Sequence, residues 1–338
     1  MLSCKNSTEQ KIIVDQFAHT LSLEIEKLKN LPVSSCPQQV LFSNGYLVIT
    51  DNYCEDKILR IIDLKSGQSE DFFRKGRGPA EMLSLDFAGH KQGDSLLFRK
   101  TANAMIWVNP AELWDSKQEK FTETERPFHD IFINCFHIND QWAYTSLSDK
   151  GFLVFTDNNG ELVDTTPFYS LIDDIPKKGN IAYTYYSNTT YEHKNGVFVS
   201  ALRYFPIIKI ISGEGKIKKI IQSQKRFKNP EFDDHGIAPQ PETTYFYDSV
   251  LASENYIYAL QYQASISDLN QMNFYPSLEV FDYKGNAHLK IQFSEPFGSI
   301  DIDFVNGVIY GGALCQQKRE YSLARVIIPD EFKKFFIN

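Results

Sequence analysis

The stretch from Asp51 to Glu81 sets a pattern that the rest of the chain repeats. It contains the apolar run Ile58-Leu59-Arg60-Ile61-Ile62-Asp63-Leu64, a turn at Lys65-Ser66-Gly67, and a second run, Ser69-Glu70-Asp71-Phe72-Phe73-Arg74. It ends on Lys75-Gly76-Arg77-Gly78-Pro79-Ala80-Glu81. Apolar runs on both sides of a Gly turn, followed by a segment rich in Gly and Pro, predict two antiparallel strands that leave through a rigid loop.

Turn signals of this kind recur at six places between apolar runs. They are Asn44-Gly45, Gly93-Asp94, Asn139-Asp140, Asn195-Gly196, Glu254-Asn255 and Asn306-Gly307. Successive signals begin 46 to 59 residues apart, and five of the six units contain a second apolar run and a second turn. A repeat of about 50 residues with four short strands is typical of a propeller blade. The sequence therefore predicts an all-β chain folded as a six-bladed antiparallel β-propeller.

The sixth unit is short of one strand, because it offers only the runs 300–304, 308–311 and 321–328. Near the N-terminus, Leu21, Leu23 and Ile25 alternate with polar residues, which predicts a half-buried strand over 20–27. An open sheet edge exposes unpaired backbone groups. We therefore expect the strand 20–27 to pair with 321–328 and to close the ring.

This interpretation divides the chain into three parts. Residues 1–19 are an N-terminal tail, residues 20–330 form the propeller, and residues 331–338 are a C-terminal tail. The expected blades span approximately 37–75, 84–122, 131–168, 180–224, 245–294 and 299–328, the last with the strand 20–27.

The composition excludes several classes of protein. The net charge is −8 and the most basic run is Lys216-Ile217-Lys218-Lys219, which disfavours binding to nucleic acid or to anionic lipid. The apolar runs are shorter than the ~18 residues of a membrane-spanning helix. The five cysteines form no C-x-x-C pair, so neither a zinc knuckle nor a thioredoxin-type site is indicated.

Cys4 is the cysteine with a candidate role, as a lipidation site. Leu2-Ser3-Cys4, followed by a polar stretch, is similar to the end of a bacterial lipoprotein signal, in which the Cys becomes the lipidated first residue. The alternative is an ordinary cysteine in a tail, since no apolar segment precedes it in this sequence. The first interpretation predicts a periplasmic or surface lipoprotein that meets a membrane only through its lipid.

The run from Arg74 to Glu81 resembles a family signature. Arg74-Lys75-Gly76-Arg77-Gly78-Pro79-Ala80-Glu81 is similar to the G-R-G-P-x-E motif of six-bladed TolB-like (NHL-like) propeller lipoproteins from the envelopes of Gram-negative gut bacteria. Ala80 stands where a second Gly is more usual. The alternation of turns and strands is similar over residues 20–330. The resemblance implies an exported propeller of the cell envelope, and it implies no particular reaction.

The same run has two physical interpretations. Its backbone N–H groups and Arg77 could bind an anion. Alternatively, Gly76 and Gly78 provide tight bends, Arg77 pairs with a carboxylate such as Glu81, and Pro79 stiffens the approach to the next strand. The structural interpretation is favoured, because the run lacks the Lys-Ser/Thr ending and the following helix of a nucleotide-binding loop.

Two long connections, 165–182 and 223–245, are the candidate ligand-binding loops, because propellers bind ligands mostly at such loops and connections of this length are often functional. The candidate ligand-binding residues are Arg77, Tyr185, Arg203, Tyr204, Asp234 and His235. Aromatic, cationic and acidic side chains together suit a polar ligand with a planar face, such as a glycan or a peptide. The alternative is that the tyrosines pack between blades.

No catalytic or metal-ligating residue is assigned from the sequence, and no cofactor is identified. The histidines lack i, i+4 metal spacing, and there is no Gly-x-Ser-x-Gly elbow. The sequence therefore favours a monomeric, exported module that binds a polar small molecule, a glycan or a protein. Two alternatives stay open. One is a propeller hydrolase, lyase or lactonase with converging carboxylates or histidines, and the other is a structural subunit of an envelope complex with an exposed apolar patch.

Overall fold

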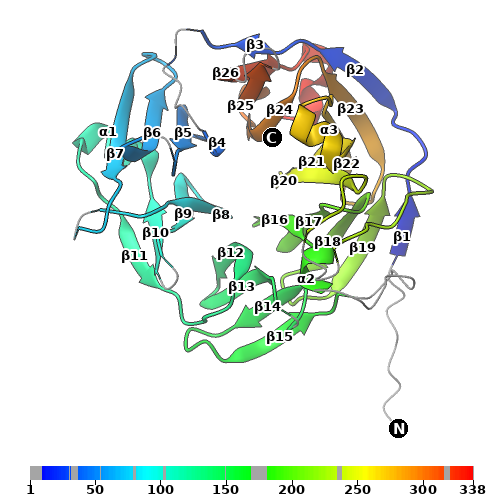
Figure 1. Cartoon of the computed structure of the whole chain (residues 1–338), viewed down its shortest axis with the longest axis horizontal. Helices are drawn as coiled ribbons and strands as arrows, with labels where there is room; N and C mark the ends of the chain where they lie inside the picture. Colours follow the sequence, from blue (N-terminus) through cyan, green and yellow to red (C-terminus); the bar gives the residue numbers. More distant parts are fainter. Residues whose placement is uncertain are drawn as a thin grey trace.

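The computed structural model describes residues 10–29, 31, 37–53, 55–78, 81–101, 104–148, 150–168, 181–233, 238–315 and 320–337. In this part of the chain, six small sheets are arranged in a ring (Figure 1). The N-terminal segment contributes the outer strand of the last sheet. The prediction of an all-β, six-bladed propeller closed by an N-terminal strand is confirmed.

Each blade is an antiparallel meander whose first strand lies at the centre of the ring. Blades 1 to 3 consist of β4 (Gln39–Ser43), β5 (Tyr46–Thr50), β6 (Lys57–Asp63) and β7 (Ser69–Arg74); β8 (Asp86–Gln92), β9 (Ser95–Arg99), β10 (Ala104–Val108) and β11 (Thr122–Glu125); and β12 (Phe132–Ile138), β13 (Gln141–Ser146), β14 (Leu153–Thr156) and β15 (Leu162–Thr166). Blades 4 to 6 consist of β16 (Ser187–Glu192), β17 (Val197–Leu202), β18 (Ile207–Ser212) and β19 (Ile217–Gln222); β20 (Thr244–Ala252), β21 (Tyr256–Ser265), β22 (Ser277–Asp282) and β23 (Ala287–Phe293); and β24 (Phe297–Asp303), β25 (Val308–Cys315) and β26 (Glu320–Ile327), completed by β3 (Glu26–Lys27).

The middle strands of the blades are buried on both faces. All six residues of β17 and of β18 are buried, and in β6 the buried residues include Ile58, Leu59 and Ile61. Each blade is packed between two neighbours, so side chains on both sides of a middle strand leave water. This packing explains why the sequence shows continuous apolar runs instead of strict alternation.

All six turn signals read from the sequence lie between the first and second strands of a blade. Asn139 and Asp140 adopt positive φ angles of 49° and 60°, as a tight hairpin requires. The expected second turn at Asn109-Pro110 is different, because the helix α1 (Pro110–Ser116) begins there. The Asn109 carboxamide oxygen accepts the Ala111 N–H at 3.0 Å, and Pro110 fits the first helical turn, so the two residues start a helix instead of a hairpin.

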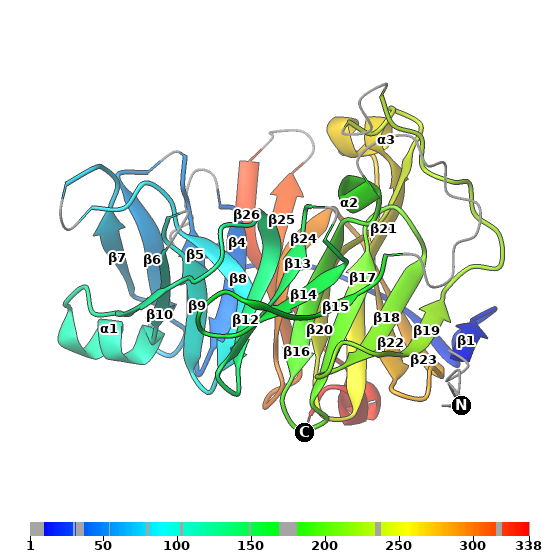
Figure 2. The ribbon, with the colours of Figure 1, turned by 90° about the horizontal axis from the view of Figure 1, so that it is seen from below.

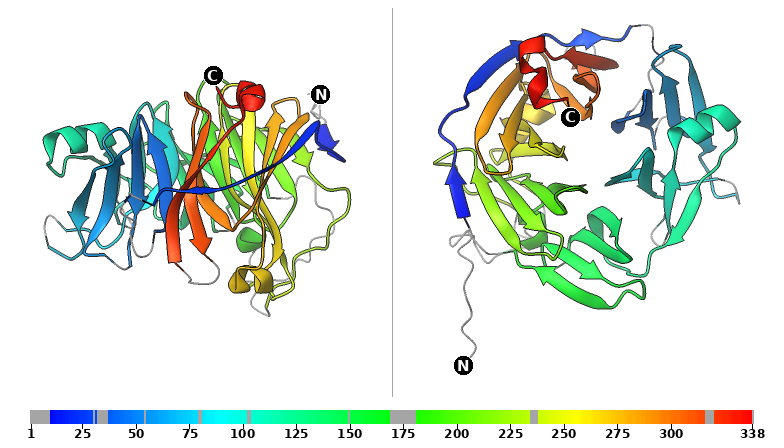
Figure 3. Two further views of the ribbon diagram at one scale, coloured as in Figure 1. Left: turned by 90° about the horizontal axis from the view of Figure 1, so that it is seen from above. Right: turned by 180° about the vertical axis from the view of Figure 1, so that it is seen from behind.

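The N-terminal residues 10–27 form a belt around the outside of blades 4, 5 and 6 (Figure 3). In this belt, β1 (Gln10–Ile13) pairs in parallel with β19, and β2 (His19–Leu23) pairs in parallel with β23. Of the residues expected to pair with 321–328, only Glu26 and Lys27 do so. The pairing expected for residues 20–25 is wrong. The N-terminal segment passes the outer edge of blade 5 before it reaches blade 6, and residues 20–23 pair there with β23. The predicted tail 1–19 thus contains a strand.

The ring has two different faces (Figure 2). The face at the top of Figure 2, called the upper face, carries the loops between the second and third strands of each blade and the loops between blades, with the helices α2 (Ile181–Thr184) and α3 (Ile266–Gln271). The opposite, lower face carries the connections between the first and second strands and between the third and fourth strands, with α1 and the C-terminal 3-10 helix η1 (Asp330–Phe335). Phe335 and Phe336, in the predicted C-terminal tail, are buried in the core of blades 5 and 6.

The belt enters the propeller from the lower face. The outer strand β19 runs from the lower face to the upper face, and β1 is parallel to it. Gln10, which lies beside Lys219 in β19, is therefore the end of β1 that is directed toward the lower face, away from α2 and α3. Among the described helices, none has the length and apolar character needed to cross a lipid bilayer.

Candidate functional site

A cavity of about 510 Å³ lies at the centre of the ring. The first strands of all six blades line it, and Tyr186 and Arg203 reach it from the upper loops of blade 4. A cavity of this size and position is a default candidate for a ligand site in a protein of this fold.

Much of the polar lining of this cavity joins one blade to the next. The first strand of each blade has an edge without a neighbouring strand, and side chains from the preceding blade satisfy backbone groups there. At five junctions the bonds are Phe87 N–H to Gln39 Oε1, His137 N–H to His90 Nδ1, Thr189 N–H to Asn134 Oδ1, Asn188 Nδ2–H to Asp248 O, and Val40 N–H to Ser299 Oγ. These polar side chains hold the ring together.

The lower end of the cavity contains an ion pair whose carboxylate is buried. The Asp301 carboxylate is paired with the Lys91 ammonium and also accepts the Phe42 N–H at 2.7 Å. Within the described part of the chain, no group of three or more His, Cys, Asp or Glu residues is placed to hold a metal ion. The Asp301 carboxylate is occupied by these two contacts within the protein.

The upper mouth of the cavity is different, because two aromatic rings contact a cation there and two further rings continue from them. We call Tyr186, Arg203, Tyr245, Tyr262 and Phe274 the aromatic rim. The guanidinium carbon of Arg203 lies 3.6 Å from the centroid of the Tyr186 ring and 4.9 Å from that of Tyr245. Tyr245 is stacked on Tyr262 at 5.4 Å, and Tyr262 contacts Phe274 at 4.7 Å. The rim thus extends from blade 4 across blade 5.

The backbone fixes Arg203 in this position. Arg203 N–H donates to Tyr186 O at 2.8 Å, and Phe246 N–H donates to Arg203 O at 2.6 Å. Burial acts to lower the pKa of Arg203, but Tyr245, Tyr186 and Asp248 outweigh it and raise the pKa above the ordinary arginine value. The guanidinium is therefore permanently charged and held with its plane against an aromatic ring.

Asp248 provides the acceptor of the rim. Its Oδ1 accepts the Tyr245 hydroxyl at 2.9 Å, and it lies in the cavity lining beside Arg203. Burial and the Asp248 carboxylate raise the pKa of Tyr245 and of Tyr262 well above the ordinary tyrosine value. Both phenols therefore keep their protons and act as hydrogen-bond donors.

A side cavity of about 230 Å³ extends the mouth toward blade 6. It shares Gln38, Val40, Asp248 and Ser299 with the central cavity, and Tyr262 and Phe274 line it as well. The two cavities therefore adjoin at these residues, and aromatic rings, a fixed cation, a carboxylate and an amide lie around them. This set of groups binds and orients a polar molecule, and the rim itself contains no nucleophile and base arranged as a pair.

The structure separates the residues that the sequence proposed for one pocket. Arg203 lines the central cavity. Tyr185 and Tyr204 are only 2% and 8% exposed, and they belong to the hydrophobic core shared by blades 3 and 4. They pack between blades because the Tyr185 ring is stacked on Phe205 and the Tyr204 ring stands edge-on to Phe232.

Arg77 lies exposed in the connection between blades 1 and 2, across the ring from blade 4. Its expected partner Glu81 instead accepts the Gly78 N–H at 2.8 Å and lies 3.9 Å from Arg74. The expected pairing of Arg77 with Glu81 is therefore wrong, because the tight turn folds Gly78 back over the carboxylate. Asp234, His235 and Cys4 lie outside the described residues.

The sequence shows Tyr186 and Tyr245 among the aromatic residues near the two long connections, but neither was selected as a site residue, and Asp248 was not singled out. The nearby aromatic cluster was visible, but Tyr186 is exposed to the cavity while its neighbour Tyr185 faces the core. The short helix α2 ends immediately before these two residues, so strand alternation could not decide which one points inward. Asp248 carried no signal, because it lies inside a strand and not in a loop.

Comparison with solved structures finds the same fold at low sequence identity. A protein of Bacteroides fragilis NCTC 9343, described as a candidate exported protein, is 14% identical with a TM-score of 0.56, over 94% of this chain and 98% of that one. A member of the DUF4221 family from Bacteroides vulgatus ATCC 8482 is 10% identical with a TM-score of 0.57, over 89% and 94%. A luciferin-regenerating enzyme is 7% identical with a TM-score of 0.50, over 90% and 95%. These identities show the fold alone. No protein-family model and no curated protein matches the chain.

Proposed function

We propose that this protein is an exported binding module, and that its aromatic rim holds a polar ligand with a planar face, such as a glycan or a peptide segment. The observation that carries the proposal is the placement of Arg203 between Tyr186 and Tyr245, beside Asp248, at the mouth of a cavity of about 510 Å³.

The groups of the rim match such a ligand in number and strength. Stacking of one planar face on a tyrosine contributes about 0.5–1.5 kcal/mol beyond its buried area. A charge-assisted hydrogen bond to Arg203 contributes about 1.5–3 kcal/mol. These two contributions sum to about 2–4.5 kcal/mol. Binding at micromolar strength needs about 8 kcal/mol, so the surface that the ligand buries against the rim has to supply the remainder and to offset the cost of association.

Two features support an extracytoplasmic location. The similar protein from Bacteroides fragilis is described as a candidate exported protein, and the run from Arg74 to Glu81 resembles the motif of TolB-like propeller lipoproteins.

The binding proposal is tested by calorimetric titration of the full chain with a panel of defined oligosaccharides and peptides. We expect at least one micromolar ligand, and Arg203→Gln should weaken it about tenfold or more, because one charge-assisted hydrogen bond is lost. Tyr186→Ala should weaken the same ligand. Lys284→Gln, in an exposed turn of the lower face, is the matched control and should leave affinity unchanged. A ligand that binds all three variants equally would place the site elsewhere.

The anchor proposal has a separate test. The protein made in its own cells should partition with membranes, and Cys4→Ala should release it into the soluble fraction. An equally membrane-bound Cys4→Ala variant would contradict lipidation at this residue without affecting the binding proposal.

A further inference from the structure

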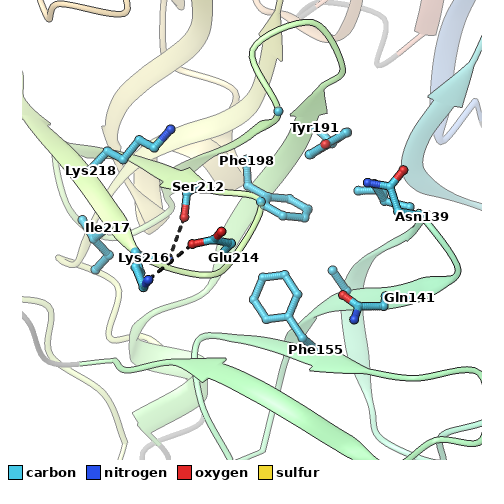
Figure 4. Close-up of a pocket in the computed structure, with 14 residues that line it drawn as sticks. Asn139, Gln141, Phe155, Tyr191, Phe198, Ser212, Glu214, Lys216, Ile217 and Lys218 are labelled. Carbon is cyan, nitrogen blue, oxygen red and sulfur yellow. Dashed lines mark hydrogen bonds and ion pairs between the residues drawn. The ribbon is translucent and has the colours of Figure 1, made fainter.

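A second cavity, of about 750 Å³, lies between blades 3 and 4 and opens on the lower face. It is separate from the aromatic rim, which lies at the upper mouth. Figure 4 shows that Gln141 and Phe155 from blade 3 face Glu214 and Phe198 from blade 4 across this space.

Small residues on both walls create the space. Ala143 lies on the blade 3 side, and Gly196, Ser212 and Gly213 lie on the blade 4 side. The two turns of blade 4 are tied together, because Gly213 N–H donates to Gly196 O at 2.9 Å. The walls are also tied to each other, because the Thr166 hydroxyl donates to Gly215 O at 2.7 Å. The cavity is therefore part of the fixed frame of the two blades.

The floor of the cavity is apolar. The rings of Phe155 and Phe198 meet edge to face, with centroids 5.7 Å apart, and Ile217 adds an aliphatic side chain. Tyr191 stands beside Phe198 at 4.8 Å and remains partly exposed. An apolar side chain that enters the cavity would meet carbon atoms on several sides.

The rim of the cavity has polar groups that no contact within the described chain occupies. The side chains of Asn139, Gln141 and Lys218 have no hydrogen-bond or ion-pair partner among the described residues, and all three are exposed. Lys216 and Glu214 form an ion pair at 3.3 Å, and both are well exposed to solvent. Two amides and one unpaired ammonium therefore surround an apolar floor.

We propose that this cavity binds a short extended peptide segment with an apolar side chain and, two residues later, an acidic one, because every second side chain of an extended chain points to the same side. The apolar side chain occupies the space above Phe155 and Phe198. Gln141, with both a donor and an acceptor, matches the N–H and C=O of a peptide backbone. Lys218 pairs with the acidic side chain. This charge complementarity gives a role to Lys218, which belongs to the most basic run of a chain with a net charge of −8. The proposal is independent of the function proposed for the upper rim.

The test uses the pentapeptide acetyl-Ala-Phe-Ala-Asp-Ala-amide and the full chain labelled with ¹⁵N. Titration should give saturable NMR shifts of the Gln141 side-chain amide and of the backbone amides of β13. Lys218→Glu should weaken binding about tenfold or more, because an attractive charge becomes repulsive, and Gln141→Ala should weaken it severalfold. Both residues are exposed, so neither change removes core packing. Acetyl-Ala-Phe-Ala-Lys-Ala-amide should also bind more weakly.

The controls separate this site from other sources of binding. Lys225→Glu makes the same change of charge at an exposed position on the upper side of blade 4, and it should leave the affinity unchanged. Arg203→Gln should also leave it unchanged. The proposal is overturned if the peptide gives no saturable shifts, or if the Lys218→Glu variant binds as well as the native chain. It is equally overturned if maltose or anionic lipid vesicles give the β13 shifts and the peptide does not.

Discussion

Blades 1 to 3 and blades 4 to 6 have the same strand order, but only the outer edges of blades 4 to 6 pair with the N-terminal segment. On blades 4 to 6, residues 10–27 add β1 to β19, β2 to β23 and β3 to β26. On blades 1 to 3, the outer strands β7, β11 and β15 have no further strand among the described residues. The aromatic rim comes from blades 4 and 5, so the proposed ligand site is built on the belted half. The belt therefore fixes the blades whose geometry the site requires.

The open half protects its edges with charge. β7 carries Glu70 and Asp71, and β11 carries Glu123 and Glu125, which disfavour pairing with a strand of another molecule. β15 begins instead with Leu162, which is 61% exposed. The outer edges of the propeller are therefore protected in two ways, by added strands on blades 4 to 6 and by charged side chains on blades 1 and 2. Each kind of protection can be removed without the other.

The largest expected effect comes from removal of the belt. Deletion of residues 1–28 takes away Val14 and Ile25, which are buried, and Phe17 and Leu21, which pack against the cores of blades 4 to 6. A fully buried large apolar side chain contributes about 1.5–3 kcal/mol. We therefore expect the free energy of unfolding to fall by about 5 kcal/mol or more, measured by urea titration. A synthetic peptide of residues 10–28 should restore part of the loss. An unchanged Tm would show that the belt is dispensable.

A single substitution in each half sharpens the comparison. Phe17→Ala removes a belt ring that contacts Phe281 at 5.4 Å and packs beside a buried cluster. We expect it to cost about 2–3 kcal/mol, somewhat less than a fully buried ring. Leu162→Ala, on the open edge of blade 3, should cost less than about 0.5 kcal/mol. Similar losses for both variants in chemical unfolding would contradict the unequal treatment of the two halves.

Much of this fold could be predicted from the sequence, because local signals determine it. The six turn dipeptides mark the six inner hairpins, and Asn44-Gly45 and Asn139-Asp140 adopt the positive φ angles that their residue types favour. The belt could be predicted only as a strand. The alternation of Leu21 and Leu23 shows that one face is buried, but it does not say which edge buries it or in which direction. The pairing partner depends on the outer edges of blades 4, 5 and 6, which come next to the N-terminal segment only in the folded ring.

The candidate site could be predicted less well. Arg203 was found because it lies in a short turn among aromatic residues, and that turn reaches the cavity. Tyr186, Tyr245 and Asp248 depend on how blades 4 and 5 face each other, which no local pattern encodes. The cavity between blades 3 and 4 was not predicted from the sequence, because it results from the small size of residues such as Ala143 and Gly213, which face each other only in the folded ring.

Acid should weaken the open half through His90, which lies between blades 2 and 3. Burial, helped by the nearby His193 and His137, lowers the pKa of His90 from 6.5 to about 3. Below pH 6.5 the His90 side chain is protonated in the unfolded chain, whereas in the folded chain it stays neutral until about pH 3. The free energy of unfolding therefore decreases as the pH falls through this window. Between pH 7 and pH 5 the expected loss is about 2 kcal/mol.

The measurement is urea unfolding at pH 7 and pH 5, for the native chain and for His90→Gln. The variant loses the ring that accepts the His137 N–H, so it should be less stable at pH 7, but its further loss at pH 5 should be smaller by about 2 kcal/mol. Hydrogen exchange at pH 5 should show the weakening in β8 and β12 more than in β20 to β23. Equal pH dependence in both chains would exclude His90 as the source.

The smallest effect isolates a single contact between the belt and blade 5. Gly285 and Gly45 both lie in hairpin turns with positive φ angles of 91° and 84°. An alanine at either position would lower the free energy of unfolding by about 1–2 kcal/mol, because a residue with a Cβ disfavours this left-handed conformation. A Cβ at Gly285 would also lie 2.5 Å from Cδ1 of Ile12, whereas one at Gly45 would meet nothing within 4 Å.

Gly285→Ala should therefore cost about 1 kcal/mol more than Gly45→Ala in chemical unfolding. The excess should disappear in an Ile12→Val background, because valine lacks the Cδ1 methyl group that the new side chain would strike. If the excess persists there, it comes from the turn of blade 5 itself and not from the belt. If it disappears, the side chain of Ile12 is held over Gly285 in solution, as parallel pairing of β1 with β19 requires.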